Sequence, residues 1–71
     1  MANPRFVVFP DSAGEYRWRL IAGNSEIVAV SESYTTKPSA ARSAKRVREI
    51  AHEATIVDQE AINALTNLFR R

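Results

Sequence analysis

The clearest pattern in the chain is an alternation of residue types over positions 14–22. If this stretch is a β-strand, Tyr16 and Trp18 point to one of its sides, and Arg17 and Arg19 point to the other. Burying an aromatic ring removes roughly 150 to 250 Å² from water, so the two rings are the natural start of a hydrophobic core. We therefore expect the fold to be organised around this strand.

Two further strands are predicted, one before and one after this stretch. Residues 5–9 contain four consecutive apolar residues and stop at Pro10, and residues 26–31 contain a second apolar run. Turn-forming residues at positions 11–14 and 23–25 would connect the strands as hairpins. Because both outer strands are apolar on both of their sides, we expect something to cover each face of this antiparallel sheet.

A helix is predicted from about residue 36 or 37 onward. Thr36 can act as its N-cap, and Pro38 fits within its first turn. Small side chains then recur at steps of three and four residues, which lets the helix axis approach the sheet closely. The expected core consists of apolar residues of the first two strands and of these regularly spaced helix residues. They are Phe6, Tyr16, Trp18, Leu20, Ala40, Ala44, Val47 and Ala51.

The C-terminal part is predicted to hold a short fourth strand and a last helix. Residues 55–57 are Thr-Ile-Val, a β-branched run with little helix preference, and Asp58 is a suitable N-cap for a helix over residues 59–69. The predicted fold class is α+β: a three-stranded antiparallel meander packed against one helix, with element order β-β-β-α-β-α. Its expected parts are a flexible N-terminus at 1–4, a domain at 5–58 and a C-terminal helix at 59–71.

The composition argues against an enzyme or a metalloprotein. The 71 residues include no cysteine, two glycines and one histidine, His52. Two glycines cannot build a dinucleotide-binding or phosphate-binding loop, and the carboxylates show no metal-type spacing. His52 falls beside the basic side of the predicted helix, so we expect it to be exposed to solvent. We expect no catalytic residue, no metal site and no cofactor.

Positive charge is concentrated in residues 37–48, although the net charge of the chain is only +2. The ordinary interpretation is a solvated helix face, because Glu49 and Glu53 follow within reach of its cations. The alternative is a surface that binds a polyanion such as nucleic acid.

A second basic patch is expected on the sheet, on the side opposite the aromatic rings. Arg17 and Arg19 lie there, and Arg5 joins them if the first strand pairs in register. Glu15 and Glu26 share this area, and alternate arginines also protect an exposed strand from aggregation. The candidate polyanion-binding residues are Arg5, Arg17, Arg19, Lys37, Arg42, Lys45 and Arg46.

The aromatic residues allow two interpretations. Tyr16 and Trp18 would suit a base-stacking platform for single-stranded nucleic acid, but without them the domain has almost no core, which favours burial. Tyr34 precedes the helix in a loop, where it either plugs the edge of the core or contacts a partner.

The strands and the first helix resemble the YegP-like family of small, uncharacterised bacterial and archaeal proteins. The most specific part is the string Gly-Glu-Tyr-Arg-Trp-Arg-Leu at 14–20. The resemblance includes Phe6, 11–20, Glu26-Ile27, Ala29, Ser31-Glu32, Tyr34, Lys37, Ser39-Ala40 and Val47, and more weakly 56–58. The chain departs from the family pattern at Asn24-Ser25, where Asn-Gly is usual, and at Ala44, where a larger aliphatic residue is usual.

The resemblance implies no catalytic or binding residues, but it bears on the oligomeric state. Family members often repeat this unit in tandem, so a single copy implies a homodimer. The contact would involve the second sheet face, an exchanged fourth strand, or the apolar side of the last helix, which bears Ile62, Leu65, Leu68 and Phe69. The apolar runs are too short to span a bilayer, and we expect a cytoplasmic protein without membrane contact.

Overall fold

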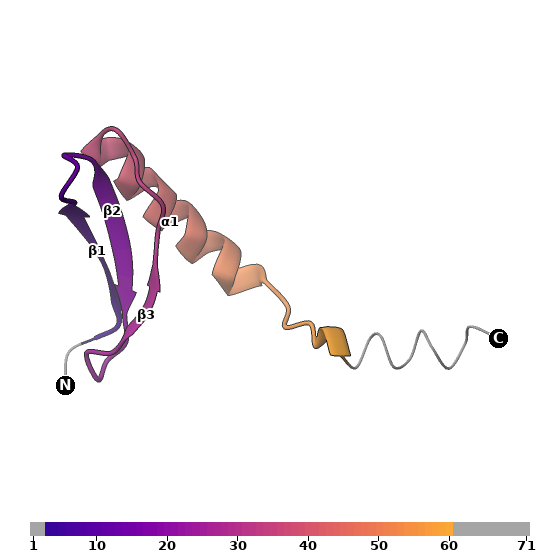
Figure 1. Cartoon of the computed structure of the whole chain (residues 1–71). Helices are drawn as coiled ribbons and strands as arrows, with labels where there is room; N and C mark the ends of the chain where they lie inside the picture. The colour runs from indigo at the N-terminus through magenta and orange to yellow at the C-terminus, as the bar shows by residue number, and fades with distance from the viewer. Residues whose placement is uncertain (1–2, 61–71) are drawn as a thin grey trace.

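The computed structural model describes residues 3–60, which form a three-stranded sheet and one long helix (Figure 1). The strands are β1 (Arg5–Pro10), β2 (Tyr16–Ile21) and β3 (Ile27–Val30), and the helix is α1 (Lys37–Glu53). The sheet order is β1-β2-β3, and both neighbouring pairs are antiparallel. The predicted α+β class, the meander and the first helix are therefore confirmed.

The register divides the sheet into two different faces. Val8 lies opposite Trp18 in the ladder, and Phe6 lies opposite Leu20, so these side chains share one face. The helix α1 packs on β1 and β2 at this face. The register shifts between Leu20 and Ile21 where β2 meets β3, and such an irregularity bends a strand and increases its twist.

Short-range interactions fix the turns and the start of the helix. Gly14 closes the first hairpin with a φ of 79°, and Ser25 closes the second with a φ of 71°. Ser25 therefore occupies the left-handed region that favours glycine, at the position where the sequence departs from the family pattern. Thr36 is the N-cap, as predicted, and its hydroxyl accepts a bond from the Ser39 amide at 3.3 Å.

The core of the described residues is small and lies between β2 and the first half of α1. Trp18, Ala40 and Ala44 are the buried hydrophobic residues, with exposed fractions of 7%, 0% and 7%. The Phe6 ring meets the Trp18 ring edge-on, with 5.1 Å between centroids and an angle of 73° between planes. Large strand rings thus pack against small helix side chains. The other expected core residues on the strands and helix, Phe6, Tyr16, Leu20 and Val47, are half-buried.

Two expectations need correction. Ala51 was expected in the core but is exposed, because α1 diverges from the sheet toward its C-terminal end (Figure 1). Residues 55–57 form no strand, because the helix carries them away from both sheet edges, and Ile56 is 100% exposed. Of the predicted last helix, residues 59–60 are helical, and 61–69 lie outside the described residues.

Candidate functional site

Asp11 organises the first hairpin. Its Oδ1 accepts bonds from the amides of Ala13 and Glu15, both at 2.9 Å, and its Oδ2 accepts one from Arg17 Nε at 3.1 Å and one from the Ser33 hydroxyl at 3.3 Å. The Glu15 amide, together with these weaker donors, lowers the pKa of Asp11 below its ordinary value against a smaller opposing effect of desolvation. This carboxylate serves to hold the turn, because its four bonds all go to the protein.

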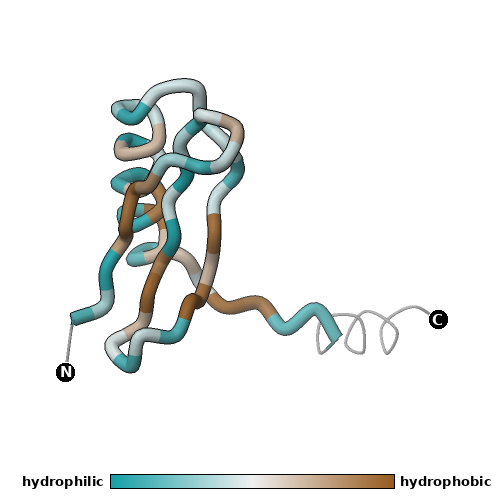
Figure 2. The backbone as a smooth tube through the Cα atoms, turned by 60° about the vertical axis from the view of Figure 1, so that its left-hand side comes forward, coloured by the Kyte–Doolittle hydropathy of each residue, from teal (hydrophilic) through white to brown (hydrophobic). Residues whose placement is uncertain are grey.

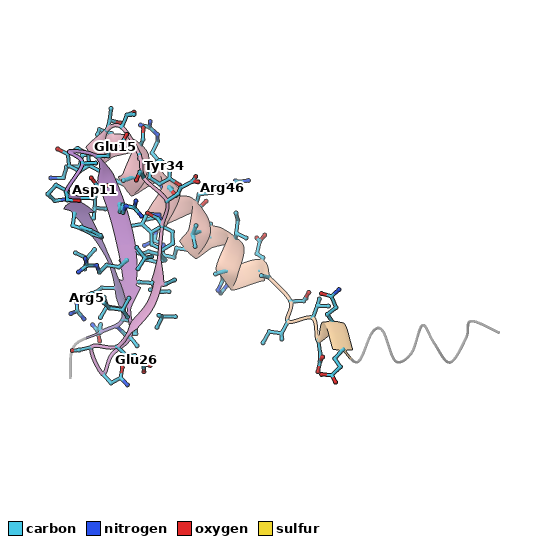
Figure 3. The ribbon with its side chains drawn as sticks, viewed as in Figure 1. Arg5, Asp11, Glu15, Glu26, Tyr34 and Arg46 are labelled. Atoms are coloured by element: carbon cyan, nitrogen blue, oxygen red, sulfur yellow. The ribbon has the colours of Figure 1, made fainter. Side chains whose placement is uncertain are left out.

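The arginines of the sheet are already engaged within the protein. The register places Arg5, Arg17 and Arg19 on the face opposite α1, as predicted. However, Arg17 pairs with Asp11 and its Nη1 lies 3.4 Å from the Ser31 carbonyl, and the Arg19 guanidinium stacks 3.9 Å from the centroid of the Phe9 ring. Figure 3 shows Arg5 near one end of the sheet and Asp11 at the other. The three arginines thus share a face without forming a compact patch of free cations.

A second polar cluster joins the sheet to the helix. Trp18 Nε1 donates to Ser43 Oγ at 3.0 Å, and the same oxygen lies 2.6 Å from the Tyr34 hydroxyl. The Tyr34 backbone also bonds to Tyr16 in both directions, at 2.8 and 2.7 Å. Trp18 is therefore part of the core and no stacking platform, and Tyr34 closes the edge of that core.

The strand β3 is the largest uncovered apolar element of the described chain. Ile27, Val28 and Val30 are 54%, 61% and 53% exposed, and α1 makes no contact with β3. Figure 2 shows hydrophobic residues on all three strands and again in the segment that follows α1. In that segment Ile56 and Val57 are 100% and 63% exposed. Exposed apolar residues that lie together mark interaction surfaces in folded proteins.

The outer side of α1 carries cations that are not paired. Within residues 3–60 the salt bridge that forms is Arg17–Asp11, so Glu49 and Glu53 lie near the helix cations without forming salt bridges to them. The Arg42 guanidinium bonds to the Ser39 hydroxyl at 3.3 Å. The exposed basic residues of α1 are Lys37, Arg42, Lys45, Arg46 and Arg48.

A groove runs between β1 and α1. Its floor is apolar, with Phe6 and Val8 from the strand and Ala41 and Ala44 from the helix, and its rim is basic. The rim residues are Lys45 and Arg48. At one end the groove meets a hollow lined by Pro4, Arg5, Phe6, Leu20 and Arg48. We call these two connected hollows the β1–α1 groove.

The described residues contain no arrangement typical of a metal site or a membrane span. Within residues 3–60 no group of three or more His, Cys, Asp or Glu side chains is placed so that it could hold a metal ion. His52 is exposed in the last turn of α1, as expected. None of the helices in this part of the chain is long and apolar enough to cross a membrane. The expected dimer residues Ile62, Leu65, Leu68 and Phe69 lie outside the described part.

Sequence reasoning missed Ser43, Arg48 and the exposure of β3. Ser43 lies next to the small residues Ala40 and Ala44 on the predicted helix. Because the N–H group of a buried tryptophan usually has a hydrogen-bond partner, a serine at this position could have been predicted to accept from the Trp18 indole. Arg48 belongs to the basic run but was not among the candidate binding residues. The exposure of β3 had no sequence signal, because it depends on where the helix crosses the sheet.

These features define a small α+β domain with a tight hairpin, a tryptophan-centred core and open apolar surface. The chain belongs to the family described as "Domain of unknown function (DUF1508)", which matches residues 11–58. The predicted resemblance to YegP-like proteins is thereby confirmed.

Relatives occur in both bacteria and archaea. A UPF0339 protein of Treponema denticola is 35% identical over 54 residues, covering 76% of this chain and 93% of the relative. A UPF0339 protein of Methanosarcina acetivorans is 38% identical over 53 residues, covering 75% and 91%. The solution structure of a protein from Haloferax volcanii has a TM-score of 0.70 at 36% identity, covering 82% of this chain and 98% of that one. The relatives' names assign no function.

Proposed function

We propose that this protein is a self-associating interaction module that forms a homodimer. The observation that carries the proposal is the exposure of large apolar side chains around a very small core. Within residues 3–60 the exposed large hydrophobic residues are Ile27, Val28, Val30, Ile50, Ile56 and Val57. Fully burying one such side chain stabilises a protein by about 1.5 to 3 kcal/mol, so covering several of them offsets much of the cost of association.

A second copy is the partner of choice for this surface. A chain of 71 residues is near the lower size limit for folding alone, and oligomerisation is a common way to complete such a core. A copy could cover the sheet face opposite α1, or accept residues 55–57 as an added strand. It could also contact the helix that the sequence predicts at the C-terminus, through Ile62, Leu65, Leu68 and Phe69. In a two-fold dimer each of these contacts is made twice.

The proposed module is not an enzyme and needs no cofactor. In support, the Asp11 carboxylate accepts hydrogen bonds from the backbone amides of Ala13 and Glu15, so its role is to hold the first turn. The single histidine, His52, is exposed on α1 beside Glu49 and Glu53, and the three line an open hollow on the helix surface.

Light scattering on the full chain tests self-association. The protein should elute with twice the monomer mass of 7.9 kDa over a wide concentration range. A mass of one chain throughout that range would refute the proposal. Cutting the chain after Asp58 then separates the contacts, because a dimer that survives the cut does not depend on the C-terminal helix.

Polyanion binding through α1 is the second candidate, and the unpaired cations of that helix favour it. Lys45 and Arg46 are exposed on α1, whereas Arg17 and Arg19 on the sheet are engaged. Binding to heparin or generic DNA should weaken steeply with salt, because counterion release drives it. The helix variants K45Q and R46Q should each weaken this binding, and the sheet variant R19Q, which removes the same single charge, should not. Equal binding by the helix and sheet variants would count against this candidate.

A further inference from the structure

We infer that the polyanion bound by α1 is duplex DNA, with the helix lying in the major groove and its cations on the phosphates of both groove walls. This inference rests on the second candidate function and names its partner and its mode of docking. It does not depend on the oligomeric state, because all the contacts come from one helix of one chain.

The exposed cations of α1 lie in two rows. Lys45 and Arg48 are three positions apart and line the hollow between the helix and β1, so this row lies on the flank toward β1. Arg42 and Arg46 are four positions apart and line a second hollow on the outer surface of the helix, together with Lys45. The helix therefore carries positive charge on both flanks of its outer side.

These side chains are available to a partner. All four are exposed, and within residues 3–60 none of them forms a salt bridge. Arg42 donates to the Ser39 hydroxyl at 3.3 Å, but a guanidinium has five N–H donors, so others remain for a phosphate. No other described segment lies over the outer side of α1 (Figure 1). Glu49 is the acidic residue in the lining of the outer hollow.

The size of the helix matches the major groove of B-form DNA. An α-helix with its side chains is roughly 10 to 12 Å across, and the groove is about 12 Å wide. The cations of α1 extend from Lys37 to Arg48, about 16 Å along the axis at a rise of about 1.5 Å per residue. Each DNA strand carries a phosphate every 3.4 Å or so along its axis, so each row of cations comes within reach of several phosphates.

Single strands and duplex RNA suit this helix less well. Proteins that bind single strands stack the bases on exposed aromatic rings, but α1 contains no Phe, Tyr or Trp, and Trp18 is buried. Duplex RNA has the same kind of charged backbone, but its major groove is too deep and narrow for protein side chains to enter. The shape of the groove therefore separates duplex DNA from the other two.

Fluorescence anisotropy with the full chain tests the choice of partner. The probes are a short labelled DNA duplex, an RNA duplex of the same sequence, and one of the DNA strands alone. The DNA duplex should bind several-fold more tightly than the other two. Equal affinity for the DNA and RNA duplexes would overturn docking in the major groove while polyanion binding stands. If none of the probes and no heparin binds, the second candidate function itself fails.

Single substitutions test the two rows. R42Q and R48Q each remove one charge, from opposite flanks of α1, and each should weaken binding to the DNA duplex several-fold. Each should also reduce the slope of affinity against salt by about one unit. The control R19Q removes one charge from the sheet and should change neither. If only one of the two helix variants weakens binding, the helix lies against the outside of the duplex, and the inference is wrong.

Removing the acidic residue of the outer hollow should have the opposite effect. Glu49 lines this hollow beside Arg42 and Lys45, so its carboxylate repels a phosphate that approaches them. E49Q should therefore bind the DNA duplex more tightly than the unmodified protein. The control E26Q removes an exposed carboxylate beside β3 and should have no effect. Unchanged binding by E49Q would show that the outer side of α1 does not face the DNA.

Discussion

The indole nitrogen of Trp18 donates a hydrogen bond to the hydroxyl of Ser43 at 3.0 Å, and this bond joins the central strand to the helix. The same hydroxyl lies 2.6 Å from the hydroxyl of Tyr34, so one serine serves the polar ends of two aromatic rings. The ring of Trp18 is buried at the centre of the small core, and its only polar atom is satisfied at the helix surface. This link sets the position of α1 over β2.

Replacing Ser43 with alanine should destabilise the fold. The S43A variant leaves both Trp18 Nε1 and the Tyr34 hydroxyl without their partner, and an unsatisfied buried polar group costs about 1 to 3 kcal/mol. Urea unfolding followed by tryptophan fluorescence measures the loss. The control S12A removes an exposed hydroxyl in the first turn and should change the free energy of unfolding by less than about 0.5 kcal/mol. Equal stability of the two variants would contradict the assigned role of Ser43.

Enlarging the buried alanine Ala40 should overpack the core. Its side chain is 0% exposed, so the variant A40L must displace the sheet or the helix, at a cost of about 1 to 3 kcal/mol. Ala51 is exposed on the same helix, and A51L should leave stability nearly unchanged. Thermal unfolding of both variants measures the difference. A larger loss for A51L than for A40L would place the core at the wrong end of α1.

The stability of the fold should depend on the ionisation of Asp11. Because its pKa in the folded state lies below the ordinary value of 3.8, the ionised form stabilises the fold above that pH. This contribution should be lost as the pH falls through the lower folded pKa. The variant D11N removes the charge, so the stability difference between the two proteins should be largest near neutral pH and shrink in acid. Urea titrations at several pH values measure it, and a difference that is independent of pH would refute the assignment.

Both hairpin turns should favour glycine, so adding glycine at position 25 and removing it at position 14 should change stability in opposite directions. Ser25 has a φ of 71°, a region that costs an ordinary residue about 1 to 2 kcal/mol, so S25G should raise the free energy of unfolding by up to about 1 kcal/mol. Gly14 has a φ of 79°, and a Cβ there meets no atom within 4 Å. G14A should therefore lower stability through the backbone alone. The unfolding midpoints in urea should move in opposite directions, and a shared direction would contradict the turn geometry.

The sequence was sufficient to predict the features that depend on local pattern. Alternation at 14–22 identified the faces of β2, and turn chemistry located the hairpin at Gly14. The N-cap at Thr36 followed from residue type and position. The buried alanines Ala40 and Ala44 followed from helical spacing, since small side chains permit close approach to a ring.

Features that depend on the placement of whole elements could not be predicted in this way. The angle between α1 and the sheet decides that Ala51 is exposed, and no local pattern encodes this angle. The β-branched run at 55–57 has strand propensity, but a strand also needs a free edge within reach, which α1 does not provide within one chain. Alternation placed Arg17 and Arg19 correctly, yet their engagement with Asp11 and Phe9 is a tertiary effect.

The most direct test of the central claim, that one copy exposes surface which a second copy covers, is the thermal midpoint of unfolding at two protein concentrations. Dimerisation links stability to concentration, so a hundredfold increase should stabilise the folded dimer by roughly 2.7 kcal/mol and raise its midpoint by several degrees. A midpoint that is the same at both concentrations would show that the folded state is a single chain, and would contradict the account.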